Sequence, residues 1–275
     1  MATLSRIVEL CLLLPSLCHI AVAVSQGDLA NYKIASFSYE DPHSNPNAKF
    51  NHFTIDQESG DVYVGAVNRL FRLNSSFDHE KNITTYNNTD RPDRDSNYNK
   101  ILIIYPPLGL ITCDSENNGQ CQLRNLIDLS VIMSTVYPVT SIAEKASVAT
   151  IGPGRNQKDY LYVGATFDQS DRRNIPLISR RRLKYGSGFL AASSEYDIVF
   201  GRRYLADTII NYIKVFSFRG FTYFVSFHLA SKLSRVCQDG ANLDSYTEIT
   251  LQCSGSDGSV TAWCKQLTLD QQDLI

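Results

Sequence analysis

The side chains that could support catalysis or metal binding are few, and their spacing does not group them. The five histidines share no H-x-x-x-H pattern, and Cys253 and Cys264 lack the nearby histidine pair of a zinc site. The glycine turns at 152–154 and 186–188 do not continue into a phosphate-binding G-x-x-x-x-G-K-[ST], and no G-x-S-x-G elbow occurs. The sequence therefore predicts no catalytic site, no metal and no cofactor, so the protein is not expected to be an enzyme.

Positive charge is the more informative feature. Residues 155–219 contain 12 Lys or Arg against 6 Asp or Glu, although the whole chain has a net charge of −2. The densest part of this segment consists of Arg172, Arg173, Arg180, Arg181, Arg182 and Lys184. Such a cluster could bind heparan sulfate, an acidic protein surface or a processing protease, or it could be a solvated rim. It lacks the interleaved aromatic residues of a nucleic-acid groove, so nucleic acid is not an expected partner.

The elements that must position these side chains follow from length and composition. With 275 residues, 43% of them hydrophobic and 20% charged, the chain has room for one large globular domain or two small ones. That composition excludes a disordered or collagenous chain. The 15 Tyr and 13 Phe residues, in short runs with β-branched neighbours, favour strands over helices.

The first 23 residues are expected to be a secretory signal peptide. An apolar run begins at Cys11, is too short to span a bilayer, and ends in the small-x-small cleavage pattern Ala21-Val22-Ala23. A buried N-terminal helix is the alternative. No later window approaches about 18 apolar residues, so we expect no membrane span in this chain and, as written, a secreted product.

In the oxidising secretory pathway, cysteines can form disulfides and Asn-x-Ser/Thr sequons can be glycosylated. Cleavage would leave an odd number of cysteines, namely Cys113, Cys121, Cys237, Cys253 and Cys264, and hence at least one thiol without an intrachain partner. Three Asn-x-Ser/Thr sequons begin at Asn74, Asn82 and Asn87. They predict a glycosylated surface loop within residues 74–99, and a polar loop with unused sequons is the alternative.

The remaining chain reads as short strands joined by turns, with an internal echo. Tyr63-Val-Gly-Ala66 recurs as Tyr162-Val-Gly-Ala165, and the segments 110–113 and 223–226 occupy equivalent places, at offsets of 47, 52 and 61 residues. A period near fifty built from short strands is typical of four-stranded propeller blades. Residues 191–213 are ambiguous and could be a surface excursion.

Several segments in order resemble the sema domain of the plexin family, the semaphorin receptors. They include Phe50–Asp56 followed by Val62–Leu73, then Leu110–Cys113 with Gly119–Arg124. The order continues through Tyr160–Thr166, Ile178–Leu183, Phe221–Leu229 and Ser234–Cys253. The resemblance covers residues 50–253, and Asn68-Arg69 is closer to plexins than to semaphorins.

The resemblance implies an all-β fold, a seven-bladed β-propeller of which about the first half, three to four blades, is present. The expected organisation is a signal peptide (1–23), an N-terminal segment (24–49) and a partial sema domain (50–275). The family pattern pairs Cys113 with Cys121. Cys237 and Cys253 resemble positions whose partners lie beyond Ile275, and Cys264 has no assigned partner. Half a ring would leave apolar blade faces open, so the chain is expected to be truncated or fragmentary.

The function that the resemblance implies is binding of semaphorins outside the cell by a plexin-type cell-surface receptor in guidance signalling. A co-receptor or heparan sulfate is a further expected partner, and the basic cluster is the expected ligand surface. The alternatives are a soluble decoy, or another protein with a sema domain such as a semaphorin or a scatter-factor receptor. A secreted propeller hydrolase would need convergent carboxylates or a metal site, which the sequence does not contain.

Overall fold

The computed structural model describes residues 36–39, 49–86, 96–106, 108–116, 119–135, 138–140, 145–166, 175–186, 189–190, 209–240, 243–254 and 260–261. The chain divides into two compact units, Met1–Tyr39 and Glu40–Ile275, and the described strands all lie in the second. The expected signal peptide lies outside the described residues, as do Asn87, Arg172, Arg173 and Cys264.

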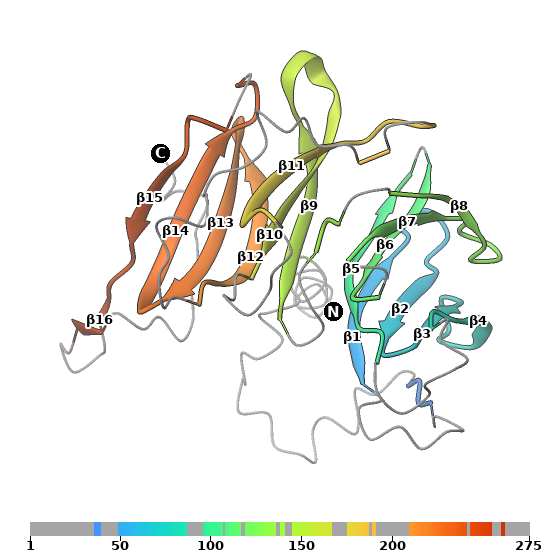
Figure 1. Cartoon of the computed structure of the whole chain (residues 1–275). Helices are drawn as coiled ribbons and strands as arrows, with labels where there is room; N and C mark the ends of the chain where they lie inside the picture. Colours follow the sequence, from blue (N-terminus) through green and yellow to red (C-terminus); the bar gives the residue numbers. More distant parts are fainter. Residues whose placement is uncertain are drawn as a thin grey trace, which may run out of the picture. The chain divides into compact units, whose positions relative to one another are not determined.

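The second unit is built from antiparallel sheets (Figure 1). The first sheet contains β1 (Phe50–Ile55), β2 (Val62–Ala66), β3 (Arg69–Leu73) and β4 (His79–Thr84). The second contains β5 (Asn99–Tyr105), β6 (Gly109–Asp114), β7 (Cys121–Arg124) and β8 (Val131–Ser134). The third contains β9 (Ser147–Pro153), β10 (Asp159–Ala165) and β11 (Ile178–Arg182), with a short 3₁₀ turn, η2 (Arg155–Gln157), between its first two strands. The fourth contains β12 (Asn211–Phe218), β13 (Phe221–His228), β14 (Ala230–Cys237) and β15 (Thr247–Thr250), and β16 (Cys253–Ser254) pairs with β17 (Val260–Thr261).

The turn chemistry explains why these segments form hairpins. Between β1 and β2 the carboxylate of Asp56 accepts hydrogen bonds from the Glu58 amide and the Ser59 hydroxyl, and Gly60 takes a φ of +76°. Aspartate and glycine favour such a turn because aspartate bonds to the backbone of the next residues and glycine has no Cβ to clash at positive φ. β2 and β6 are buried along their whole length, as expected for strands covered on both faces.

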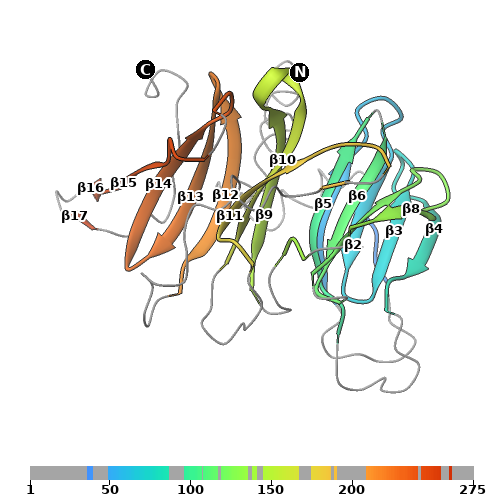
Figure 2. The same ribbon diagram turned by 45° about the horizontal axis from the view of Figure 1, so that its top comes forward.

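The sheets lie side by side in chain order, with their first strands adjacent (Figures 1 and 2). β1 contacts β5, β5 contacts β9, and β9 contacts β12. His52 in β1 lies beside Asn99 at the start of β5, and the Tyr105 hydroxyl at the end of β5 donates to Asp159 after the first turn of the third sheet. The first strands therefore run parallel to one another. The first turn of every sheet lies at one end of the stack, which we call the hairpin end.

The hydrophobic core consists of layers between neighbouring sheets. Between the first and second sheets the layer contains Tyr63, Leu70, Leu102, Leu110 and Leu129. The layer between the second and third sheets contains Ile101, Ile111, Cys113, Cys121, Leu123, Leu161 and Val163. The layer between the third and fourth sheets contains Tyr162, Ile178, Tyr212, Val215, Phe224 and Val236. Burial of these side chains is the main source of stability. A further cluster belongs to the fourth sheet alone and contains Tyr223, Val225 and Leu233.

The echo found in the sequence marks the second strand of every one of these four sheets, namely β2, β6, β10 and β13. Its alignment in the second sheet is, however, shifted by one residue. Tyr63 and Tyr162 face the following sheet, whereas Leu110 faces the preceding one, and Ile111 holds the place equivalent to the tyrosines. A shift of one residue reverses the face because strand side chains alternate.

The prediction of an all-β fold with four sheet repeats is confirmed, and the described sheets do not close into a ring. The prediction of a loop through residues 74–99 was wrong in part, because β4 (His79–Thr84) pairs with β3 and completes the first sheet. β12 takes residues 211–213 from the end of the ambiguous segment, and most of that segment, residues 191–208, lies outside the described residues. No helix in the described part of the chain is long and apolar enough to cross a membrane.

Candidate functional site: the basic strand and the sheet-to-sheet contacts

β11 contains three successive arginines. Because successive side chains of a strand point to opposite faces of the sheet, the three arginines have different surroundings. Its sequence is Ile-Ser-Arg-Arg-Arg, and it pairs antiparallel with β10 so that Tyr162 lies opposite Arg180 and Leu161 opposite Arg181. Arg180 is only 3% exposed and Arg181 only 4% exposed. Buried charged side chains need hydrogen-bond partners, so their contacts decide their role.

Arg180 joins the third sheet to the fourth. Its Nη1 donates to the backbone oxygens of Gly240 at 2.9 Å and Gln238 at 3.4 Å, both just after β14. The guanidinium carbon lies 5.0 Å from the centre of the Tyr160 ring. These contacts hold the β14–β15 connection against β11, a structural role.

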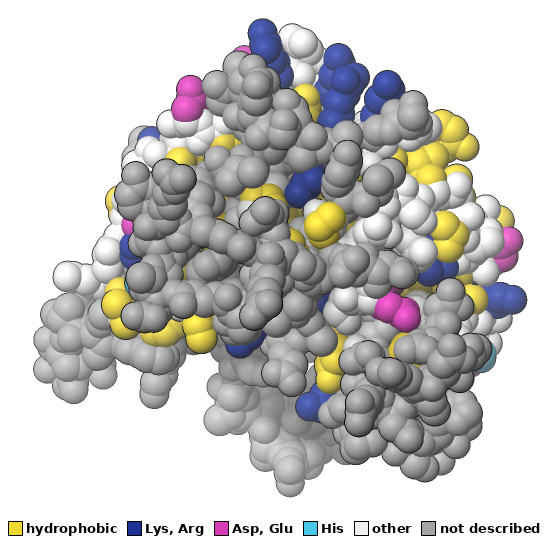
Figure 3. Space-filling model, viewed as in Figure 1, with side chains coloured by type: hydrophobic (Ala, Val, Ile, Leu, Met, Phe, Trp, Pro, Cys, Tyr) yellow, Lys and Arg dark blue, Asp and Glu magenta, His cyan; other side chains and the backbone are white. Residues whose placement is uncertain are grey.

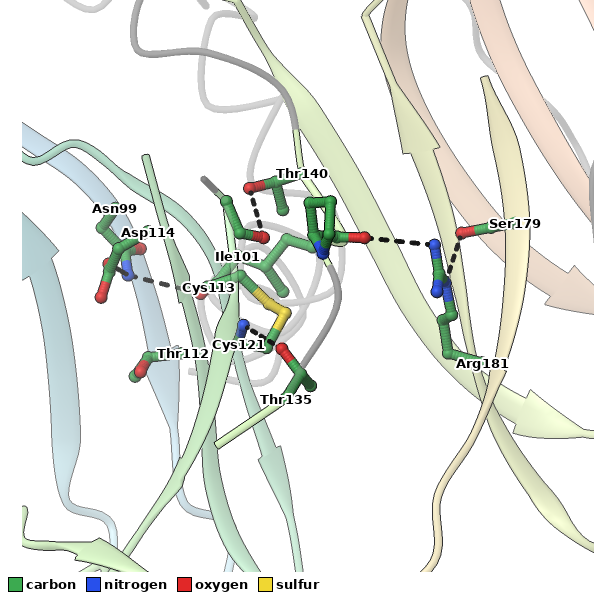
Figure 4. Close-up of a disulfide and its surroundings, with 12 residues drawn as sticks. Asn99, Ile101, Thr112, Cys113, Asp114, Cys121, Thr135, Thr140, Ser179 and Arg181 are labelled. Atoms are coloured by element: carbon green, nitrogen blue, oxygen red, sulfur yellow. Dashed lines mark hydrogen bonds between the residues drawn. A yellow bond between two sulfur atoms is a disulfide. The ribbon is translucent and has the colours of Figure 1, made fainter. Parts of the chain in front are cut away.

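Arg181 points the other way, toward the second sheet (Figure 4). Its Nη2 donates to the Pro138 backbone oxygen at 3.3 Å, and its Nε donates to the Ser179 hydroxyl at 3.3 Å. Pro138 lies in the segment that follows β8. Successive arginines of one strand therefore tie the third sheet to both of its neighbours.

The basic run predicted as one ligand surface is therefore divided by the structure. Arg180 and Arg181 do not fit that prediction, because both guanidinium groups lie inside sheet contacts. Arg182 is partly exposed and Lys184 is exposed, so for these two residues a ligand surface stays a prediction. Arg172 and Arg173 lie outside the described residues.

Other cations that the sequence prediction did not single out lie at the same end as Arg182 and Lys184. Arg155 and Lys158 belong to the β9–β10 turn, Arg219 to the β12–β13 turn, and Arg235 to the end of β14. All four side chains are exposed. Figure 3 shows Lys and Arg side chains along the upper margin, above the part of Figure 1 where the β9–β10 turn lies. Arg155, Lys158, Arg182, Lys184, Arg219 and Arg235 form what we call the basic hairpin surface.

The repeat contains a signal for part of this surface. The turn after the first strand of the third repeat contains Arg155 and Lys158, and the same turn of the fourth repeat contains Arg219. The corresponding turn of the first repeat carries Asp56, Glu58 and Asp61 instead. Comparing equivalent turns, rather than counting charge along the chain, would have found the positive side chains of this end.

The predicted pair Cys113–Cys121 is present as a disulfide (Figure 4). The two residues face each other across β6 and β7, with their Cα atoms 4.0 Å apart, and both are fully buried. The Cys121 amide donates to the Thr135 hydroxyl at 2.9 Å, which fixes the chain after β8 to the same place. The disulfide lies in the layer between the second and third sheets and is part of that core.

A polar link joins the first and second sheets next to this disulfide. The Asn99 amide nitrogen donates to the Asp114 carboxylate at 3.1 Å, and the Asn99 amide oxygen lies 3.1 Å from His52 Nδ1. Burial raises the pKa of Asp114 to about 6, although the bond from Asn99 and the charge of Arg124 act in the opposite direction. Burial also lowers the pKa of His52. The sequence prediction missed this link because its members lie on three separate strands.

Of the two sequon asparagines inside the described residues, one follows β3 directly and the other lies in the outer strand β4 of the first sheet. The Asn74 side chain accepts from the Ser76 and Asp78 amides and donates to the Glu80 carboxylate, so it also shapes the turn after β3. Asn82 lies in β4 and is half-buried beside His79. Glycosylation of both asparagines stays a prediction.

Two further cysteines, Cys237 and Cys253, lie within the described residues. Cys237 ends β14, is partly exposed and has no disulfide partner within the described residues. Cys253 is placed by its backbone in β16. Among the residues that the structure describes, no group of three or more His, Cys, Asp or Glu side chains could hold a metal ion. What this geometry offers is a set of charged and polar turns on a rigid scaffold, an arrangement suited to binding.

Comparisons with known proteins find the same fold in solved extracellular proteins. No family model matches the chain. The fold is similar to that of Drosophila Semaphorin 2a, with a TM-score of 0.52 and 17% identity over 76% of this chain and 41% of that one.

Within that class the resemblance to plexins is confirmed. The chain is 27% identical to Plexin-A4 of Homo sapiens over 77% of its length, and 28% identical to Plexin-B3 of Rattus norvegicus over 76%. The solved extracellular region of plexin A4 matches with a TM-score of 0.61 and 25% identity, covering 75% of this chain and 28% of that one. The chain spans only 14% of Plexin-A4 and 12% of Plexin-B3.

Proposed function

We propose that this chain is the N-terminal part of the extracellular semaphorin-binding domain of a plexin-type receptor. The observation that carries the proposal is the similarity to plexins over about three quarters of the chain, in sequence and in fold alike. Identity to the plexin A4 structure is 25%, whereas identity to the semaphorin structures is 13–17%, which favours a plexin over a semaphorin. A structure of Drosophila Plexin A in complex with Semaphorin 1b shares the fold at 14% identity.

In this proposal the four sheets are the first blades of a seven-bladed propeller. Two features support it. The first strands of successive sheets contact one another, as the innermost strands of neighbouring blades do, and three layers of core lie between neighbouring sheets. The proposed domain reaches the extracellular face of the plasma membrane through the secretory pathway and carries glycans at Asn74, Asn82 and Asn87.

The proposed mechanism is recognition by surface complementarity, not catalysis. Turns at the rim of a rigid sheet scaffold present charged side chains, and rim charges mainly set the association rate and the choice of partner. Arg182 and Lys184 are the members of the predicted cluster that the described structure leaves accessible. We assign them to the semaphorin-binding rim.

The test is direct binding of the secreted full chain to a panel of semaphorin extracellular domains, measured by surface plasmon resonance. Arg182→Glu with Lys184→Glu should lower the association rate constant for the bound semaphorin by about tenfold. The dissociation rate constant should not change. The matched control is Lys49→Glu with Lys81→Glu, two exposed lysines, of which one directly precedes β1 and the other lies in β4. A folded chain that binds none of the semaphorins would refute the proposed function, and an unchanged rate for the double variant would refute the assigned residues.

A further inference from the structure

We propose that the basic hairpin surface is a binding site for a sulfated glycosaminoglycan chain. The site consists of Arg155, Lys158, Arg182, Lys184, Arg219 and Arg235, on the third and fourth sheets. This inference does not rest on the proposed semaphorin binding, because it follows from the arrangement of charge alone.

The hydrogen-bonding register brings these six cations to one end of the two sheets. Tyr160 lies opposite both Gly152 and Arg182, which places the end of β11 beside the β9–β10 turn. A Cβ built on Gly152 would lie 2.6 Å from the Ser217 hydroxyl, so the end of β9 lies against the end of β12 and its turn. Phe221 lies opposite Cys237, which adds the end of β14 to the same place. Cations from two turns and from the ends of β11 and β14 therefore share one surface.

The positive charge of this surface is not neutralised locally. The ion pairs Arg72–Asp61 and Lys232–Glu248 of the described residues involve none of the six. Asp239 and Asp244 are exposed nearby, and the third acidic group, Asp159, accepts the hydrogen bond of Tyr105. Six cations against these three carboxylates leave a positive field that would attract and concentrate a polyanion.

Two of the arginines are held in a geometry that suits sulfate. The guanidinium carbon of Arg219 lies 5.2 Å from the centre of the Phe218 ring, and that of Arg235 lies 4.4 Å from the centre of the Phe221 ring. Stacking on a ring restrains the planar guanidinium while its edge N–H groups stay available for oxygen anions. Less side-chain entropy is then lost when a sulfate binds.

The chemistry of the surface favours a polysaccharide over an acidic protein. A protein interface normally has an apolar centre with a polar rim. On the third and fourth sheets at this end, the exposed large hydrophobic side chain among the described residues is Tyr185, and the β9–β10 turn adds the exposed polar residues Asn156 and Gln157. A flexible sulfated chain needs distributed charge and hydrogen-bond donors, which this surface has, and no apolar centre.

The experiment is heparin affinity chromatography of the secreted full chain, followed by binding measurements over a series of NaCl concentrations. Arg155→Ala, Lys158→Ala and Arg219→Ala are combined in one variant, which leaves Arg182 and Lys184 intact. The variant should elute at distinctly lower NaCl, and the slope of log affinity against log salt should become shallower by about one for each cation that contacts the chain. Circular dichroism melting confirms that the variant is folded.

The matched control removes the same number of positive charges elsewhere. Lys49→Ala, Arg69→Ala and Lys81→Ala all lie on the first sheet or just before it, and elution should not change. The inference is overturned if the control shifts elution as much as the test variant, or if neither does. It is also overturned if unsulfated heparosan or polyglutamate binds as well as heparin, since that would indicate general attraction or an acidic protein partner. Semaphorin binding of the test variant should persist because Arg182 and Lys184 are intact. Loss of heparin binding and loss of semaphorin binding are therefore separate results, and each tests its own proposal.

Discussion

The Asn99 side chain occupies the space directly over Gly65, across the boundary between the first two sheets. A Cβ built on Gly65 would lie 2.4 Å from both Cγ and Oδ1 of Asn99, closer than real atoms approach. Gly164 is the equivalent glycine of Tyr162-Val-Gly-Ala165, in the third sheet. A Cβ built on Gly164 would lie 2.9 Å from the ring of Tyr212. The glycine of the Tyr-Val-Gly-Ala repeat therefore makes room for the first strand of the following sheet.

Replacing this glycine should destabilise the fold. We expect Gly65→Ala to lower the free energy of unfolding by about 1–3 kcal/mol, the usual cost of overpacking, because Asn99 is held by His52 and Asp114 and cannot move freely. Chemical denaturation of the secreted chain measures the change. Ser75→Ala, at an exposed turn position, is the control. Equal stability of the two variants would show that the contact is not tight.

Loss of the disulfide should weaken the second sheet. Replacing Cys113 and Cys121 together by alanine should lower the free energy of unfolding by about 2–3 kcal/mol in the chain-entropy account of so short a loop. The measurement is thermal melting with and without reductant, and the double variant should lose its sensitivity to reductant. Cys237→Ser, which has no disulfide within the described residues, should melt as the parent does. Reductant sensitivity that survives in the double variant would contradict this assignment.

The buried carboxyl of Asp114 should make stability depend on pH. Burial raises its pKa from 3.8 to about 6, so between those values the folded chain binds more protons than the unfolded chain. The contribution of this carboxyl to stability is therefore greatest below pH 4 and declines as the pH rises toward 6, by up to about 3 kcal/mol for a shift of two pKa units. His52 acts in the opposite direction, because burial lowers its pKa and its protonation below about pH 6.5 costs stability.

Comparison with Asp114→Asn isolates the carboxyl from His52. The asparagine keeps an acceptor for the Asn99 amide but does not ionise, so the contribution of His52 is common to both chains. The stability of the parent relative to the variant should fall between pH 4 and pH 7, as measured by denaturation at a series of pH values. Arg124, buried nearby, stays charged over this pH range. It therefore shifts the difference in free energy of unfolding between the two chains by a constant amount and does not change its pH dependence. A difference that stays constant with pH would mean that Asp114 titrates normally.

The sequence predicted the strands and their repeat well because period-two alternation and turn residues are local signals. It failed where the outcome depends on a neighbouring sheet. The alignment of the second repeat was wrong by one residue, because it paired Leu110 rather than Ile111 with Tyr63. Residue type alone does not reveal which face of a strand meets the preceding sheet. β4 was missed because His79–Thr84 is polar and holds its place mainly by pairing with β3. The Asn99 link could not be predicted because its members come together only in the assembled stack.

The division of the basic run can be tested by one pair of matched variants. Arg180→Gln with Arg181→Gln removes donors from backbone oxygens on both neighbouring sheets, and each loss should cost about 1–3 kcal/mol because buried acceptors are left unsatisfied. Arg182→Gln with Lys184→Gln removes the same charge from accessible positions and should change stability by no more than about 0.5 kcal/mol. Secretion yield and melting temperature should fall sharply for the first pair, and affinity for anionic partners should fall for the second. Were the first pair to melt like the parent, its arginines would be solvated and the original prediction of a continuous ligand surface would stand.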